Sequence, residues 1–224
     1  MPAALVTGGS SGIGLAIARM LRDEGYDLTL ASRTKEKVEI VAAELGALAV
    51  EANVLRDEDC ERLVGEHVER FGRLDVLVNS AGVGVGGTVE KLTAKQWDLQ
   101  LGVNLRGAFL VTQAAIPLLR DSRGLVVNLA SIAGTMPVPG LAAYGAAKAG
   151  LISLTHSLNR ELEDDGIRLC ALCPGFVDTP MASWTGIAAE EMIQPEDCAE
   201  IVRMLLRLSP SARVPQVVIE RLGD

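Results

Sequence analysis

The sequence predicts an α/β fold, namely a doubly wound parallel sheet of about seven strands with helices on both faces. Short apolar runs alternate with longer amphipathic stretches along nearly all 224 residues, which is the order of repeated strand–helix–strand units. Hydrophobic residues make up 49% of the chain and aromatic residues only 3%, as is typical of aliphatic strands covered on both faces. No linker, repeat or low-complexity tract interrupts this pattern, so we expect one domain over residues 1–224.

Seven short apolar runs are the expected strands: Ala3 to Thr7, Asp27 to Ala31, Ala47 to Ala52, Asp75 to Asn79, Leu125 to Leu129, Ile167 to Cys173 and Val217 to Glu220. The stretches between them have helical patterns: Gly14 to Glu24, Lys35 to Leu45, Glu58 to Phe71, Gln96 to Leu119, Leu141 to Glu163 and Pro195 to Leu208. In such a sheet, ligands bind beyond the carboxyl ends of the strands. The residues that follow each strand are therefore the first candidates for function.

The charge balance argues against several classes of partner. The net charge is −8, with 29 acidic and 21 basic side chains, and no basic cluster suggests a grip on nucleic acid. The first residues lack the charged and apolar segments of a signal peptide, and no apolar run approaches the ~20 residues that cross a bilayer. We expect a cytoplasmic protein that binds neither nucleic acid nor membrane.

Cys170 and Cys173 form a CxxC pattern, which can be a redox or metal motif. They lie in a predicted strand, where side chains three positions apart point to opposite faces, so the two thiols are not expected to meet. His67 and His156 have no second His or Cys at ligand spacing. We therefore expect cysteines that pack in the core and no metal site.

A glycine-rich turn, TGGSSGIG over residues 7–14, leads from the first strand directly into a helix. Glycines let the backbone approach a pyrophosphate, and a helix N-terminus offers free N–H groups with a partial positive charge. The spacing is GxxxGxG and not the GxGxxG fingerprint, so a tight structural turn is the alternative. The candidate cofactor contacts are Gly8, Ser10, Ser11, Gly12, Ile13 and Gly14.

This turn resembles the TGxxxGIG motif of the short-chain dehydrogenase/reductase family, and further matches continue to about Met181. The resemblance implies a Rossmann-type sheet with NAD or NADP across its carboxyl edge. It also implies cofactor contacts after three other strands: Asn53 and Val54 near the adenine, Asn79, Ala81 and Gly82 near its ribose, and Pro174, Gly175, Val177 and Thr179 near the carboxamide and phosphates.

Two of these turns depart from the family. Relatives usually carry Asp in place of Asn53, although an Asn carbonyl can accept the same hydrogen bond from the adenine amino group. Ser80 replaces the second Asn of the family's NNAG turn. For Asn79 in the same turn, support of the sheet is as good an explanation as contact with the cofactor.

The end of the second strand bears on the choice of cofactor. A carboxylate there would bind the ribose 2′-hydroxyl of NAD, whereas an Arg accommodates the 2′-phosphate of NADP. This strand is followed by Ser32 and Arg33, and no acidic side chain occurs from Leu28 to Lys35. A solvated loop charge is the alternative for Arg33, and Ser11 stands where many NADP-using relatives have a basic residue. We predict NADP, with NAD possible.

Tyr144 and Lys148 form a YxxxK pattern, whose two side chains share one helix face. A neighbouring ammonium, helped by an oxidised nicotinamide, would lower the pKa of the phenol from about 10. By itself, in a protein of unknown fold, the YxxxK pattern would be interpreted as a Tyr and a Lys on the surface of a helix. Here Ser131, at the end of the fifth strand, precedes Tyr144 by the separation that the family shows, and Asn104 resembles the family's mid-helix Asn.

The resemblance implies a role for each of these four residues. Tyr144 exchanges a proton with the substrate oxygen, and Ser131 hydrogen-bonds the same oxygen. Lys148 lowers the tyrosine pKa and holds the nicotinamide ribose, while Asn104 anchors a water that relays protons. We predict an NADP(H)-dependent oxidoreductase that interconverts a small-molecule carbonyl and an alcohol, as carbonyl reductases and 3-oxoacyl-thioester reductases do. The alternatives are a non-catalytic NADP-binding sensor or scaffold, and a methyl-transferring protein.

Residues 181–195 are expected to form a short substrate lid. Met181, Trp184, Ile187 and Met192 could roof an apolar pocket, although packing or a subunit contact would explain them equally well. The glycine-rich segment Val83 to Thr88 is expected to form another wall. The resemblance implies a homotetramer, but the last residues depart from the family and put this state in doubt. A homodimer through the helix Leu141 to Glu163 is the other expectation.

Overall fold

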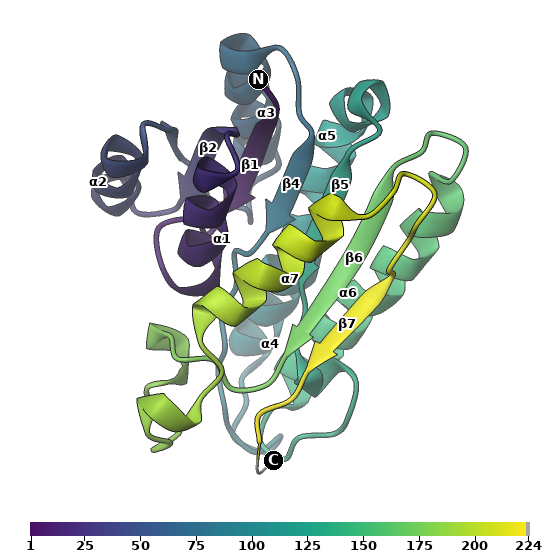
Figure 1. The fold of residues 1–224 in the computed structure, drawn as a ribbon. Helices are drawn as coiled ribbons and strands as arrows, with labels where there is room; N and C mark the ends of the chain where they lie inside the picture. The colour runs from purple at the N-terminus through teal and green to yellow at the C-terminus, as the bar shows by residue number, and fades with distance from the viewer. Residues whose placement is uncertain (223–224) are drawn as a thin grey trace.

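The computed structural model describes residues 1–222 and contains one parallel sheet in the order β3-β2-β1-β4-β5-β6-β7 (Figure 1). Its strands are β1 (Ala3–Thr7), β2 (Asp27–Ser32), β3 (Leu48–Glu51), β4 (Val76–Asn79), β5 (Leu125–Leu129), β6 (Arg168–Pro174) and β7 (Gln216–Ile219). The predicted fold class is confirmed, and every strand lies within one residue of its expected bounds. The winding reverses between β1 and β4, which is where a ligand cleft is expected.

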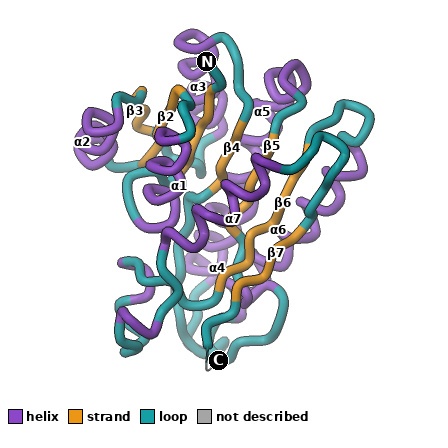
Figure 2. The backbone as a smooth tube through the Cα atoms, in the orientation of Figure 1, coloured by secondary structure: helices purple, strands orange, loops and turns teal. Residues whose placement is uncertain are grey.

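Helices cover both faces of the sheet (Figures 1 and 2). One face packs against α1 (Gly12–Asp23), α2 (Lys35–Leu45) and α7 (Pro195–Arg207). The other packs against α3 (Asp57–Phe71), α5 (Gly107–Ser122) and α6 (Ala142–Glu161). The strands are parallel, and those labelled in Figure 1 have their carboxyl ends toward its lower edge. Loops at that edge carry the candidate site residues.

Alternate residues of the strands enter different layers of the core, as the pleat requires. Cys170 packs on the face of α1 and α7, whereas Cys173 packs on the opposite face beside Leu151 of α6. The prediction that the two thiols point apart is therefore confirmed. Within residues 1–222 all four cysteines are buried and free, and no group of three potential metal ligands occurs.

The predicted helix Gln96 to Leu119 consists of three segments that follow one another without a break. They are α4 (Ala94–Leu101), the π-helical turn η1 (Gly102–Arg106) and α5, and the first begins at a capping box formed by Thr93 and Gln96. The combined helix is long and apolar enough to span a membrane by length and composition alone, which the expectation above did not foresee. It packs against α3, α6 and β4, and core helices of globular proteins have the same composition.

A side-chain bridge completes the hydrogen bonding of β6 where β7 does not reach. β7 pairs with β6 only from Ala171 onward, and the backbone of Leu169 faces the same side. There Asn159 of α6 donates to the Leu169 carbonyl (2.7 Å) and accepts from its N–H (2.8 Å). The buried amide of Asn159 therefore takes the place of a neighbouring strand.

Replacement of Asn159 by Leu is expected to lower the free energy of unfolding by about 2–4 kcal/mol, because two buried backbone groups lose their partner. Urea denaturation measures this change. Ser157→Ala is the matched control, since Ser157 is exposed on the same helix and bonds only within it. Equal stability of the two variants would show that the bridge contributes nothing.

Candidate active site

The glycine turn after β1 brings backbone against backbone. Gly8 and Gly12 have φ values of +66° and +53°, in the left-handed region that favours glycine. A Cβ on Gly8 would lie 2.8 Å from the carbonyl oxygen of Ser80, and one on Gly14 would lie 2.5 Å from that of Gly8. Ser11 precedes α1 without a side-chain cap, so it does not satisfy the first N–H groups of the helix. An anionic group could use these donors.

The turns after β1, β4 and β6 meet at this edge. The hydroxyl of Thr7 accepts hydrogen bonds from the N–H groups of Ser80 and Ala81, both at 3.2 Å. A Cβ on Gly12 would lie 3.0 Å from Cγ2 of Thr179, so the turn after β6 packs directly on the glycine turn. The predicted contacts in these turns therefore line one continuous rim.

Several residues predicted to contact the cofactor could do so only through their backbone. Ile13, Val54 and Val177 direct their side chains into the two main cores. Gly175 donates its N–H to the carbonyl of Ile219 (2.8 Å), which ties the turn after β6 to β7. Ser10 is half-buried and Ser11 is exposed at the mouth of the glycine turn.

The side chain of Asn79 supports the sheet. Its amide nitrogen donates to the hydroxyl of Thr112 (3.0 Å) and to the side-chain oxygen of Asn128 (2.8 Å). Asn128 in turn donates to Thr155 (2.9 Å), so this buried network joins β4 and β5 to the helices behind them. The amide nitrogen of Asn79 thus has the structural role that is one of its two expected explanations, while its side-chain oxygen has no partner among residues 1–222.

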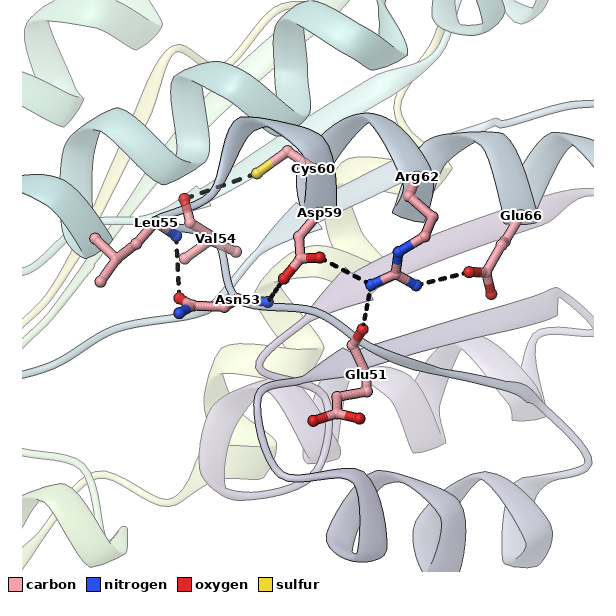
Figure 3. Close-up of polar contacts among 8 residues, drawn as sticks. All are labelled: Glu51, Asn53, Val54, Leu55, Asp59, Cys60, Arg62 and Glu66. Carbon is pink, nitrogen blue, oxygen red and sulfur yellow. Dashed lines mark hydrogen bonds and ion pairs between the residues drawn. The ribbon is translucent and has the colours of Figure 1, made fainter.

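The ends of β2 and β3 differ in how firmly they are held. Arg33 is exposed, and among residues 1–222 its guanidinium has no ion pair or hydrogen bond; next to it, the hydroxyl of Ser32 accepts the N–H of Thr34 (3.3 Å). By contrast, Asn53 is held by α3 (Figure 3). The carboxylate of Asp59 accepts the N–H of Asn53 (2.9 Å), and this bond lowers the pKa of Asp59.

Figure 3 shows how the rest of this turn is fixed. The side-chain oxygen of Asn53 accepts the N–H of Leu55 (3.1 Å), which leaves one lone pair for another donor. Arg62 joins the carbonyl of Glu51 (2.7 Å) to the carboxylate of Asp59 (3.0 Å). The third strand therefore ends in a rigid turn.

Ser131, Tyr144 and Lys148 lie together at the carboxyl ends of β5 and β6. Tyr144 lies near enough to Ser131 for that side chain to lower the pKa of its phenol, and Nζ of Lys148 lies 5.5 Å from the centre of the Tyr144 ring. Lys148 is 4% exposed and donates to the carbonyl of Leu129 at 2.5 Å. A Cβ on Gly82 would lie 3.9 Å from this Nζ, so the turn after β4 closes over the lysine.

The protein by itself raises the pKa of Tyr144, which differs from the expected lowering. Burial disfavours the phenolate, and the nearby Ser131 side chain offsets only part of that effect on the pKa. Burial also lowers the pKa of Lys148 to about 8, so its ammonium is itself easily lost. The cation and the phenol share a poorly solvated site, and this environment dominates both ionisations.

Asn104 lies in the π turn, and its side chain binds the backbone of the segment after β4. Its oxygen accepts the N–H of Val83 (3.1 Å), and its nitrogen donates to the carbonyl of Val83 (2.8 Å). The amide is thus used to hold the segment after β4.

Gln100 is a residue that the sequence analysis missed. It lies one helical turn before Asn104, is fully buried, and accepts the N–H of Val85 (3.0 Å) through its side-chain oxygen. The sequence feature that could have identified Gln100 is its spacing of four residues from Asn104, which places two amide side chains on one face of a helix.

The predicted lid is a loop that leaves and rejoins the fold through one backbone bridge. Asp178 donates to the carbonyl of Ile193 (2.9 Å), and Ile193 donates to that of Phe176 (3.0 Å). Between them lie two short 3-10 turns, η3 (Pro180–Ala182) and η4 (Ala189–Glu191). This segment projects at the lower left of Figure 1.

Met181 and Trp184 have different positions in this loop. The sulfur of Met181 would lie 3.7 Å from a Cβ on Gly84, beside the segment that packs near Tyr144. Trp184 is 66% exposed and packs edge-on against Phe176, with ring centres 6.3 Å apart. Of these two, Met181 is the one placed next to the candidate catalytic residues.

Residues 2–187 match the family model described as short chain dehydrogenase. The chain belongs to this family. A 3-oxoacyl-[acyl-carrier-protein] reductase of Staphylococcus aureus is 41% identical over 185 residues, which cover 80% of this chain and 75% of that protein. The resemblance based on the TGxxxGIG and YxxxK motifs is thereby confirmed, and the chain is an oxidoreductase of the short-chain dehydrogenase family.

Solved structures of short-chain dehydrogenases share the whole fold. An alcohol dehydrogenase of Thermococcus sibiricus complexed with 5-hydroxy-NADP superimposes with a TM-score of 0.93 at 31% identity, covering 100% of this chain and 98% of that one. A 3-ketoacyl-(acyl-carrier-protein) reductase of Brucella melitensis complexed with NADH has a TM-score of 0.90, also at 31% identity, with 98% and 96% covered.

Proposed function

We propose that this short-chain dehydrogenase is an NADP(H)-dependent enzyme that interconverts a carbonyl and an alcohol, with Tyr144 as the general acid and base. The observation that carries the proposal is the close approach of Tyr144 to Ser131, beside a buried ammonium at the rim of the glycine turn. Two hydroxyls that converge on one point can bind a single substrate oxygen.

The residues at the rim fit a nicotinamide dinucleotide. The cradle at Gly8, Gly12 and Gly14, which a Cβ would fill, admits the backbone to a pyrophosphate at the start of α1. Arg33, which follows the second strand, would bind the 2′-phosphate. Asn53, which follows the third strand, would bind the adenine. Lys148 uses one of its three N–H donors on Leu129, which leaves two for the ribose hydroxyls.

The proton chemistry follows from the ionisations. The raised pKa of Tyr144 keeps the phenol protonated at neutral pH, so it can donate to the carbonyl oxygen during reduction. Ser131 holds the same oxygen in place. When bound, the nicotinamide supplies or accepts the hydride. In the reverse direction Tyr144 takes the proton of the alcohol, a step that a positive charge next to the phenol assists.

A homo-oligomer, dimer or tetramer, is part of the proposal. Trp97 of α4 and Phe109 of α5 are more than one-third exposed, and the outer face of α6 carries small side chains such as Ala146 and Ala149. Exposed apolar surface of this kind favours contact with another subunit.

The reaction is tested by following the loss of NADPH with a panel of ketones, aldehydes, diketones and 3-oxoacyl thioesters. Turnover of one class would identify both the reaction and the substrate type. If NADPH binds but no carbonyl in the panel is reduced, the protein is better described as a cofactor-binding sensor or scaffold.

The choice of cofactor can be tested at Arg33. Arg33→Ala is expected to weaken NADPH binding about 10- to 100-fold, because a charge-assisted contact with phosphate contributes roughly 1.5–3 kcal/mol. NADH lacks this phosphate and its affinity should change little. Fluorescence titration measures both affinities. Lys37→Ala removes an exposed charge nearby and serves as the control. Parallel weakening of both cofactors would mean that Arg33 does not contact the phosphate.

A further inference from the structure

The segment Val83–Thr88, here called the substrate wall, borders the candidate catalytic residues. It has no regular secondary structure and contains three glycines. A Cβ on Gly84 would lie 3.7 Å from the sulfur of Met181 and 3.9 Å from Cε2 of Tyr144. A chain so rich in glycine loses much conformational entropy when it is ordered, so its position must be maintained by other contacts.

Few hydrogen bonds hold the backbone of the substrate wall. Asn104 binds Val83 at one end through both groups of its side chain, and Gly87 donates to the carbonyl of Gly140 (2.8 Å) near the other end. Between these two points, within the described part of the chain, the backbone makes one hydrogen bond, from the N–H of Val85 to Gln100 (3.0 Å). Gln100 is thus the middle anchor of the substrate wall.

Gln100 is costly for the fold. Its side chain is fully buried on α4, and among residues 1–222 its amide nitrogen has no hydrogen-bond partner. A buried N–H donor without a partner destabilises a protein. A methionine would fill similar volume without that cost. Stability of the fold therefore does not explain a glutamine at this position, whereas the bond to Val85 does.

We propose that Gln100 is a positioning residue that sets the width of the substrate cleft. By holding Val85, it keeps Gly84 against Met181 and Tyr144, so that a carbonyl substrate is oriented between the wall and the hydroxyl of Tyr144. This inference rests on the proposed function. Gln100 makes no hydrogen bond to the glycine turn or to the ends of β2 and β3, so it acts on the substrate side and not on the dinucleotide.

The test compares Gln100→Met with the wild-type protein. The variant should lower kcat/KM for the carbonyl substrate about tenfold, mainly through a higher KM, because the substrate meets a less ordered wall. The dissociation constant for NADPH should stay within about twofold, since the hydrogen bond of Gln100 is to Val85 and not to a predicted cofactor contact. Its melting temperature should change little, because removal of the unpartnered N–H offsets the loss of the bond to Val85. Gln113→Met, the same change at an exposed position of α5, is the matched control.

Hydrogen exchange followed by mass spectrometry gives a readout that does not depend on turnover. The peptide covering residues 83–88 should exchange faster in Gln100→Met and at the wild-type rate in Gln113→Met. If the wild-type protein reduces no carbonyl but this exchange accelerates, the proposed function fails while the positioning of the wall stands. A lower melting temperature with unchanged KM and unchanged exchange would overturn the inference and make Gln100 a residue of the fold alone.

Discussion

Replacement of Tyr144 by Phe is expected to lower kcat for carbonyl reduction about 10²- to 10⁴-fold, the usual contribution of a general acid. The substitution removes only the hydroxyl, whose partner is Ser131, and keeps the ring beside the substrate wall. The affinity for NADPH should therefore change little. Rates under saturating substrate and cofactor, followed by the loss of NADPH, measure the effect.

The only other tyrosine in the chain provides the control. Tyr26 lies at the start of β2, at the opposite end of the sheet from the candidate site, and Tyr26→Phe should leave turnover unchanged. If Tyr144→Phe and the wild-type protein show the same slow turnover, Tyr144 is not the proton donor.

Replacement of Lys148 by Met is expected to abolish most activity and, at the same time, to stabilise the fold. The folded protein lowers the pKa of this group from 10.5 to about 8, because burial disfavours the ammonium. Each pH unit of that difference corresponds to about 1.4 kcal/mol, so the charged form destabilises the fold by up to roughly 3 kcal/mol at pH 7. The variant also loses the hydrogen bond to Leu129, which offsets about 1 kcal/mol of the stability gained by removing the ammonium.

The pH dependence has a definite sign. Between about pH 8 and pH 10.5 the unfolded chain still binds the proton that the folded protein has lost. The stability of the wild-type protein therefore gains a contribution as the pH rises through this window, and Lys148→Met lacks that gain. The variant should be more stable by about 1–3 kcal/mol at pH 7, with the difference shrinking toward pH 10.

Urea denaturation at several pH values measures both trends, and Lys95→Met, at an exposed position of α4, controls for the loss of a positive charge. A Lys148→Met protein that is less stable than wild type by the same amount at every pH would show that the buried ammonium does not strain the fold. The expected outcome instead places Lys148 among residues that are retained for chemistry at the expense of stability.

The strands could be predicted because each contains a short apolar run, and in β1, β4 and β5 burial on both faces leaves no alternation to misread. The glycine turn could be predicted because Gly8 and Gly12 have positive φ, and Gly8 and Gly14 lie against backbone that leaves no space for a Cβ. Tyr144 and Lys148 could be paired because helical spacing places them on one face. Each of these features is local, or follows from a rule about what comes after a strand.

Other features depend on what surrounds a side chain. The amide groups of Asn79 and Asn104 were predicted from motif position, but their partners, Thr112, Asn128 and Val83, come from other parts of the chain. The π turn around Asn104 arises within a pattern that reads as an ordinary helix. The sequence does not show which partners fold against each amide.

The sequence alone determined the parallel sheet, the turn that can approach a phosphate, and the set of hydroxyl and amine groups that follow its strands. Spacing and residue type are sufficient for these features. Only the tertiary structure decided that burial raises the pKa of Tyr144, that Lys148 loses its charge easily, and that Gln100 holds the substrate wall. Ionisation and positioning depend on solvent exclusion and on contacts between distant segments, which come into existence only when the chain is folded.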